Sequence, residues 1–348
     1  MRTLPIRAVL PVIASLVACN GPETTGGTNA LTTGIDPTNG TVAADDDDDD
    51  DDKLDVMGGD GTGAGAEGSE DSGCEKVDFL FVIDSSPSME DEQANLLGSF
   101  PGFMSAIEDT LDVEDYHLMV VDAGMVPGGG CDGTLGAGQV RSAAGVDCGL
   151  TEGNRYASQD QGDLAAAFSC MGQRGFMGPG DEQTMDALTA AIGPLNADGQ
   201  CNAGFLRDDA ILVVTIITDE EDSPSDSVVI PALDGSCEPA DADPNSAGDP
   251  TSWADAIISA KNGDAEAAVV LSLLGDCDIG GSCEGIVLDP LNPAAPITGA
   301  EPAPRSRQFT ESFTYGSVGP VCSADYAPFF LEAVSVIDSA CDDFVPPG

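Results

Sequence analysis

Four short apolar runs stand out along the chain, and each ends in polar or acidic residues. Runs of this kind that are rich in Val, Ile, Leu and Phe are typical of strands buried on both faces of a sheet. The sequence therefore predicts strands at residues 77–83, 116–121, 210–218 and 267–274.

Between and after these runs, apolar residues recur at the three- and four-residue spacing of one helix face. Pro101 lies inside the first such segment and cannot donate a backbone hydrogen bond, so we expect it to kink or divide that helix. Residues 126–155 are rich in glycine and lack the period, which predicts a long irregular insertion stapled by its own disulfide. The predicted helices are residues 89–111, 163–171, 181–192, 251–261, 306–313 and 326–337.

Strands that alternate with helices predict an α/β fold, with a doubly wound, mostly parallel sheet that is flanked by helices. The 348 residues are enough for one large domain or two small ones. Because the alternation runs from Cys74 to the last predicted helix, we assign residues 74–348 to one disulfide-stapled domain with long loops.

The chain begins with a short apolar stretch next to Arg2 and Arg7, which is typical of a secretory signal peptide in residues 1–18. The end of this stretch, LVAC at residues 16–19, resembles the bacterial lipobox. That resemblance implies cleavage before Cys19 and a lipid anchor on Cys19. Since Asn20 follows rather than aspartate, it also implies an outer-membrane lipoprotein of the cell envelope, on the periplasmic face or the surface. The alternative is an ordinary signal peptide with a chance cysteine.

Residues 19–73 are poor in apolar side chains and include eight consecutive aspartates at 45–52. Such a segment cannot bury enough apolar surface to offset its ordering entropy, so we expect a disordered tether. A low-affinity calcium store is the alternative interpretation. The G-x-G-x-x-G pattern at residues 63–68 follows no predicted strand and does not indicate a nucleotide site.

The formal net charge is -51 at pH 7, from 62 acidic and 11 basic residues. A chain with this charge is repelled by nucleic acid and by anionic lipid, and it attracts divalent cations or basic partners. Nucleic acid is therefore not expected among the partners.

Eleven cysteines occur, and setting Cys19 aside leaves an even number, which predicts up to five disulfides in an exported chain. No C-x-x-C pair and only one histidine are present, so a zinc site is not indicated. Spacing alone leaves the connectivity open. The shortest loops favour pairing Cys131 with Cys148, Cys277 with Cys283, and Cys322 with Cys341.

Oxygen-bearing side chains follow the first and third predicted strands and begin the helix between those strands. The carboxyl ends of parallel strands share one edge of a sheet, where ligands bind. Hard cations such as Mg²⁺ and Ca²⁺ take oxygen ligands, so the sequence predicts a divalent cation site at this edge. The candidate ligands are Asp84, Ser86 and Ser88, then Glu182 and Thr184, and last Asp219.

In this order the three loops resemble those of the von Willebrand factor A domains, which form a metal-ion-dependent adhesion site. The D-x-S-x-S motif of that family is matched by Asp84, Ser86 and Ser88. Its aspartate after an apolar strand, in a T-D context, is matched by Thr218 and Asp219.

The second loop departs from the family. That loop usually reads G-T-x-T-x-x-A-L, with the first threonine a metal ligand, and Thr184 matches the second threonine. Glu182 stands at the first position, so the resemblance implies a more highly charged oxygen cage and leaves Mg²⁺ and Ca²⁺ both open. Four more acidic residues follow at the same edge of the sheet, and they form either a solvated acidic rim or a second cation site. They are Glu220, Glu221, Asp222 and Asp226.

The resemblance spans residues 77–341 and implies a Rossmann-like fold whose cation keeps a position open for a ligand carboxylate. We therefore expect an adhesion module that binds a protein or glycan and is not an enzyme. One alternative is a structural envelope lipoprotein whose candidate ligands are only helix caps and turns. A serine hydrolase is the other, although the only histidine, His117, lies in a predicted strand and no G-x-S-x-G motif occurs. The ligand and the oligomeric state do not follow from the sequence.

Overall fold

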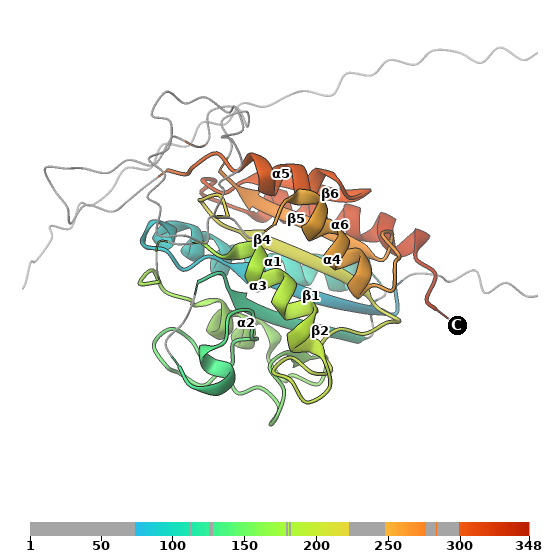
Figure 1. The fold of residues 1–348 in the computed structure, drawn as a ribbon, viewed down its shortest axis with the longest axis horizontal. Coiled ribbons are helices and arrows are strands. Elements are labelled where there is room, and N and C mark those ends of the chain that lie inside the picture. The colour runs from blue at the N-terminus through green and yellow to red at the C-terminus, as the bar shows by residue number, and fades with distance from the viewer. Residues whose placement is uncertain are drawn as a thin grey trace, which may run out of the picture. The chain divides into compact units, whose positions relative to one another are not determined.

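Figure 1 shows the structure, which is a computed structural model. The chain divides into two units, Met1–Gly65 and Ala66–Gly348. The described residues begin at Cys74 in the second unit, so the predicted signal peptide, Cys19 and the tether lie outside them. Within the described part, no helix combines the length and apolar character needed to span a membrane. The described residues are 74–111, 113, 115–124, 128–178, 180, 182–222, 248–275, 283 and 299–347.

The described residues form an α/β fold around one six-stranded sheet with the order β3-β2-β1-β4-β5-β6. Neighbouring strands are parallel, except that β3 is antiparallel to β2. The predicted mostly parallel sheet is therefore confirmed. The strands are β1 Lys76–Ile83, β2 Asp115–Asp122, β3 Ala157–Ser158, β4 Ile211–Ile217, β5 Ala268–Leu274 and β6 Tyr315–Pro320.

Helices cover both faces of the sheet (Figure 1). Alternate residues of β1 pack on opposite faces, since Phe79 and Phe81 join one core cluster while Leu80 and Val82 join the other. The first cluster contains α1 Glu90–Thr110, α2 Leu164–Gly172 and α6 Ala327–Asp343. The second contains α3 Thr184–Ile192, α4 Pro250–Ala260 and α5 Pro304–Glu311. All six predicted helices are thus present, with ends shifted by a few residues.

The first helix is continuous, so of the two predicted effects of Pro101, a kink or a division, the division is wrong. Pro101 is exposed, whereas Phe100 and Phe103 on either side of it are buried. Phe100 also stacks on Phe168 of α2, with ring centroids 3.4 Å apart. Tertiary packing on both sides of the proline therefore outweighs the one backbone hydrogen bond that it cannot make.

The edge strand β6 was not predicted, because its sequence, YGSVGP, has no apolar run. Its two glycines allow neighbouring elements to approach closely. A side chain at Gly316 would lie 2.1 Å from the Thr310 carbonyl oxygen, and one at Gly319 would lie 2.5 Å from the Phe329 ring. Packing against α5 and α6 therefore defines this strand, which intrinsic propensity does not indicate.

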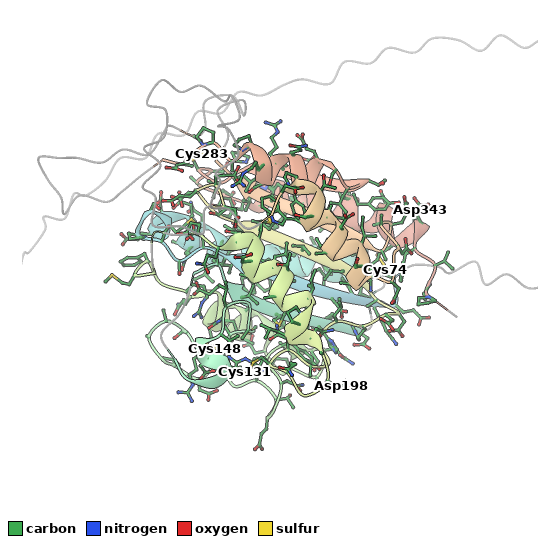
Figure 2. All side chains as sticks on the ribbon, viewed as in Figure 1. Cys74, Cys131, Cys148, Asp198, Cys283 and Asp343 are labelled. Atoms are coloured by element: carbon green, nitrogen blue, oxygen red, sulfur yellow. A yellow bond between two sulfur atoms is a disulfide. The ribbon has the colours of Figure 1, made fainter. Side chains whose placement is uncertain are left out.

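All three predicted disulfide pairings are wrong. Four disulfides are present among the described residues, and none of them closes the shortest loop (Figure 2). The sheet brings sequence-distant cysteines together, so the bonds join Cys74 to Cys341, Cys131 to Cys201, Cys148 to Cys170 and Cys283 to Cys322. Residues 237 and 277 lie outside the described residues.

The long insertion is irregular as predicted, apart from the short 3-10 helix η2 Gly130–Gly133 in its described part. It has no internal staple, which is a further correction. Cys131 instead ties it to Cys201 after α3, and Cys148 ties it to Cys170 in α2. Both ends of the insertion are thereby fixed to the rest of the domain.

Candidate metal centre

The first and third candidate loops leave the sheet side by side. Strands β1 and β4 are parallel neighbours with Ile83 in register with Ile217, and the Asp84 backbone N–H donates to the Ile217 carbonyl at 3.0 Å. The chain runs from β1 outward to β2 and returns to the other side of β1 at β4, so the strand order reverses between β1 and β4. The carboxyl ends of strands at such a reversal form the usual ligand crevice of α/β sheets.

The D-x-S-x-S loop folds around the Asp84 carboxylate. Asp84 Oδ1 accepts a hydrogen bond from the Ser86 backbone N–H at 2.6 Å, and Oδ2 accepts one from Thr218 Oγ1 at 2.8 Å. The hydroxyl oxygens of Ser86 and Ser88 lie 2.9 Å apart, beside the short 3-10 helix η1 Pro87–Met89. These four side chains are buried, so three hydroxyls and one carboxylate converge out of bulk solvent.

The second candidate loop lies at the same edge of the sheet. The Gln183 backbone N–H donates to the Ala123 carbonyl, just after β2, at 3.0 Å. At the start of α3, the Met185 N–H donates to Asp222 Oδ1 at 2.9 Å, which links this helix to the loop after β4. Glu182 is therefore held between the ends of β2 and β4.

Several buried oxygen atoms of these loops have no hydrogen-bond partner among the described groups. They are both carboxylate oxygens of Glu182, both of Asp219, and the hydroxyl oxygen of Thr184. These three residues are at most 1% exposed. A buried oxygen without a partner costs roughly 1–3 kcal/mol, and more when it is charged. A divalent cation is the kind of group that would satisfy such a set, so these residues fit one.

The pKa values of the buried carboxyl groups also indicate that a positive charge would stabilise the site. Burial raises the pKa of Asp219 to about 9, and the charge of the nearby Asp84 carboxylate adds to the effect. Burial and then Asp84 also raise the pKa of Glu182 well above its ordinary value. The carboxyl groups therefore lie close enough to repel one another, with no basic side chain among the main causes of either shift.

Glu92, in the first turn of α1, is a further member of this group that the sequence did not single out. It is 2% exposed, and one of its carboxylate oxygens has no hydrogen-bond partner among the described residues. Burial raises its pKa to about 8, with Asp91 and then Asp84 as additional causes. The sequence could have indicated Glu92 as a member of the site, because it lies four residues after Ser88 on a helix that starts at the same loop.

The acidic residues after Asp219 have structural partners. Glu221 Oε2 accepts a hydrogen bond from the Arg305 backbone N–H at 2.8 Å, and Glu221 Oε1 accepts one from Ser306 Oγ at 2.7 Å. The first contact caps the start of α5, as Asp222 caps α3, and the second ties Glu221 to a side chain of the same helix. Position 226 lies outside the described residues. Glu221 and Asp222 therefore stabilise helix ends, which neither the rim nor the second-site interpretation predicted.

No group of three or more His, Cys, Asp and Glu side chains able to hold a metal ion occurs among the residues that the structure describes. Asp84, Glu182 and Asp219 thus do not make a carboxylate cage by themselves. The predicted ligand set depends equally on the Ser86 and Ser88 hydroxyls, which lie beside Asp84.

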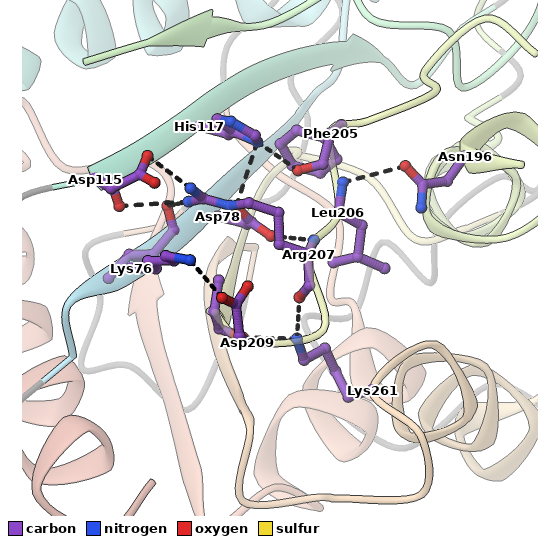
Figure 3. A network of polar contacts seen from close by, with 12 residues as sticks. Lys76, Asp78, Asp115, His117, Asn196, Phe205, Leu206, Arg207, Asp209 and Lys261 are labelled. Carbon is purple, nitrogen blue, oxygen red and sulfur yellow. Dashed lines mark hydrogen bonds and ion pairs between the residues drawn. The ribbon is translucent and has the colours of Figure 1, made fainter. Parts of the chain in front are cut away.

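The only histidine lies near the other end of the sheet, in the polar network of Figure 3. His117 is in register with Asp78, about 20 Å along β1 from Asp84 at roughly 3.3 Å per residue. Its Nδ1 lies 2.7 Å from the Phe205 carbonyl oxygen, and Asp78 pairs with Arg207 at 2.8 Å. The described residues therefore place no histidine base beside Ser86 or Ser88.

No family model matches the chain, and no curated protein matches it. Among solved structures, it is similar to proximal thread matrix protein 1 from the mussel byssus, with 12% identity and a TM-score of 0.35. The similarity covers 77% of this chain and 49% of that one, so this chain spans about half the length of the mussel protein. A similarity of this size carries no argument about fold family or function.

Proposed function

We propose that this protein is an exported, lipid-anchored von Willebrand factor A-like module that binds a protein or glycan ligand through a divalent cation. The cation is Mg²⁺ or Ca²⁺, and it exposes a Lewis-acidic position to a ligand carboxylate. The protein acts as an adhesion or interaction module rather than an enzyme. Its proposed cation ligands are Asp84, Ser86, Ser88, Glu182, Thr184 and Asp219.

One observation carries the proposal. Loops from distant parts of the chain bring oxygen atoms to the edge where β1 and β4 end, and the oxygens of Glu182, Thr184 and Asp219 are buried without partners in the described structure. Helix caps and turns would leave these oxygens bonded to backbone N–H groups. A cation-binding role accounts for their burial.

Each proposed cation ligand has its own role. The Ser86 and Ser88 hydroxyls bind the cation without neutralising it, which preserves its attraction for an external carboxylate. The Asp84 carboxylate orients the loop through the Ser86 N–H and the Thr218 hydroxyl. Glu182 adds an anionic oxygen where the family has a neutral one, so the bound cation attracts an outside carboxylate less strongly.

The disulfides support export, because such bonds persist in oxidising compartments. In this proposal Cys19 carries the lipid in the outer membrane, and residues 19–73 hold the domain away from the lipid surface. The acidic run at 45–52 extends that tether by charge repulsion.

A second candidate function is a structural envelope lipoprotein with the same fold and no working metal site. It is favoured by the absence of a group of three His, Cys, Asp or Glu side chains able to hold a metal among the described residues. The two candidates differ in whether a cation stabilises the folded chain.

Thermal unfolding in EDTA, and then in excess Mg²⁺ or Ca²⁺, separates them. A cation at one hundred times its Kd stabilises a folded protein by about 2.7 kcal/mol, which is a rise of roughly 5–10 °C in Tm for a domain of this size. We expect this rise in the wild type and its loss in Asp84→Ala. The control Glu332→Gln removes an exposed acid of α6 and keeps the rise. An equal Tm in EDTA and in both cations would favour the structural lipoprotein.

A further inference from the structure

A cavity of about 750 Å³ lies beside the β1 loop. Residues from the long insertion, from the segment after α2 and from the β1 loop line it. Those that matter here are Ser85, Arg141, Arg155, Arg174, Met177 and Gly178.

The cavity adjoins the candidate metal centre through Ser85, the residue between Asp84 and Ser86. The Ser85 carbonyl accepts a hydrogen bond from the Gly178 backbone N–H at 2.9 Å. A side chain at Gly178 would lie 2.3 Å from Ser85 Oγ and 2.7 Å from its carbonyl oxygen, so only glycine allows this approach. The cavity therefore borders the loop that carries Asp84 and Ser86.

The charge of the cavity is opposite to that of the chain. Three arginines line it in a protein with 62 acidic and only 11 basic residues. Two of them are neutralised, since Arg174 pairs with buried Asp122 at 3.0 Å and Arg155 pairs with Asp132 at 2.8 Å. The cavity thus retains one uncompensated positive charge, that of Arg141.

The Arg141 side chain is exposed and has no hydrogen-bond or ion-pair partner among the described residues. Its backbone is fixed, because the Arg141 carbonyl accepts a hydrogen bond from Arg174 Nη1 at 2.8 Å. Asp147 lies opposite Arg141 in a backbone bridge, but Asp147 Oδ1 accepts a hydrogen bond from the Gly149 N–H and the residue lines a different cavity. An exposed guanidinium that carries no ion pair, on a backbone fixed in this way, is suited to bind a carboxylate.

One large, exposed apolar side chain lines the cavity, that of Met177. Met177 is 88% exposed, and Phe176, which precedes it in the chain, is 42% exposed. Exposed Met and aromatic side chains are typical of protein interfaces, as is arginine. Met177 therefore favours a peptide with a large apolar side chain over a sugar chain.

We propose that the ligand of the metal centre is an acidic protein segment, which binds the cation through one carboxylate, Arg141 through a second, and Met177 through an apolar side chain. This inference rests on the proposed function of the metal centre. It adds the class of ligand and a second anchoring point outside the cation.

The probe is a short fluorescent oligoglutamate peptide with a central leucine, titrated with the full-length chain in Mg²⁺ or Ca²⁺. The net charge of -51 disfavours nonspecific binding of such a peptide. Arg141→Gln is expected to weaken peptide binding by roughly tenfold or more, while the Kd of the cation alone stays unchanged. Met177→Ser is expected to weaken binding of this peptide more than binding of an all-glutamate peptide.

The control Lys76→Gln removes the same charge at the amino end of β1, and peptide affinity is expected to stay unchanged. Three results would each overturn the inference. The peptide could bind wild type and Arg141→Gln with equal affinity, it could fail to bind when the cation is bound, or an oligogalacturonate could bind more tightly than the peptide. None of these results affects the cation titration. If the cation does not bind at all, the proposed function fails. Peptide binding that still depends on Arg141 would then support only a carboxylate-binding role for Arg141.

Discussion

Thr218 Oγ1 donates a hydrogen bond to Asp84 Oδ2 across 2.8 Å, joining loops that are 134 residues apart in the chain. Both residues are completely buried, and the same hydroxyl accepts a hydrogen bond from the Glu220 backbone N–H at 3.2 Å. This contact fixes the end of β1 to the end of β4 before any cation binds.

Thr218→Val keeps the shape of the side chain and removes the hydroxyl. It leaves Asp84 Oδ2 without this partner, so we expect the free energy of unfolding to fall by roughly 1–3 kcal/mol. Urea denaturation followed by circular dichroism measures the change. Thr218→Ser keeps the hydroxyl and is expected to lose less, and the account of this contact fails if the two variants are equally stable.

Gly178→Ala places a methyl group against Ser85, where the distances of 2.3 Å to Oγ and 2.7 Å to the carbonyl oxygen require the loops to separate. We expect a loss of about 1–3 kcal/mol in unfolding free energy. Gly180→Ala is a matched control, because a side chain there would have no atom within 4 Å. A similar midpoint of urea unfolding for both variants would show that the close approach is absent.

Glu182→Gln preserves size and removes the negative charge from a buried carboxyl group that lies near Asp84 and Asp219. In EDTA, we expect a higher Tm than in the wild type, because the repulsion between these carboxyl groups is reduced. In Ca²⁺, we expect an affinity about tenfold lower, since one charged oxygen is lost. Melts in both conditions measure the two effects, and an unchanged Ca²⁺ affinity would mean that Glu182 is not a ligand.

The Asp78 network at the other end of the sheet has its own pH dependence. Burial raises the pKa of Asp78 to about 6, an effect that the Arg207 guanidinium only partly offsets. An unfolded aspartate has a pKa of about 3.9, so the folded chain holds an extra proton between about pH 4 and 6. The contribution of Asp78 to stability is therefore greatest below pH 4 and is lost, by about 3 kcal/mol, as pH rises through 6.

Asp78→Asn is expected to remove this slope from the curve of unfolding free energy against pH. The comparison is Asp209→Asn, because Lys76 holds the pKa of Asp209 below its ordinary value and the stabilisation is lost as pH falls. Urea unfolding at several pH values between 3.5 and 7 distinguishes them. Parallel curves for wild type and Asp78→Asn would contradict the raised pKa.

The sequence predicted the elements that local pattern determines. Residues 211–217 and 268–274 are apolar apart from Thr215 and Ser272, and each forms a strand buried along its whole length. The positions of Asp84 and Asp219 followed from the same pattern, because polar residues directly after parallel strands share one edge. The mostly parallel sheet then brought the two loops together.

Features that depend on tertiary contacts could not be predicted from the sequence. The bond between Cys74 and Cys341 closes a separation of 267 residues, which only the packing of α6 into the same core cluster as Cys74 determines. Strand β6 exists because glycines let two helices approach it. Glu92 became a candidate only when α1 placed it beside Asp84 and Asp219.

Calorimetric titration of Ca²⁺ and Mg²⁺ into the EDTA-treated, dialysed full-length protein tests the central claim most directly. The acidic run at residues 45–52 contributes weak background binding in every variant, so the difference between wild type and Asp84→Ala isolates the site. We expect one additional site per chain in the wild type, which is missing from Asp84→Ala and retained in Glu332→Gln. Identical titrations for wild type and Asp84→Ala, with both proteins folded by circular dichroism, would contradict it.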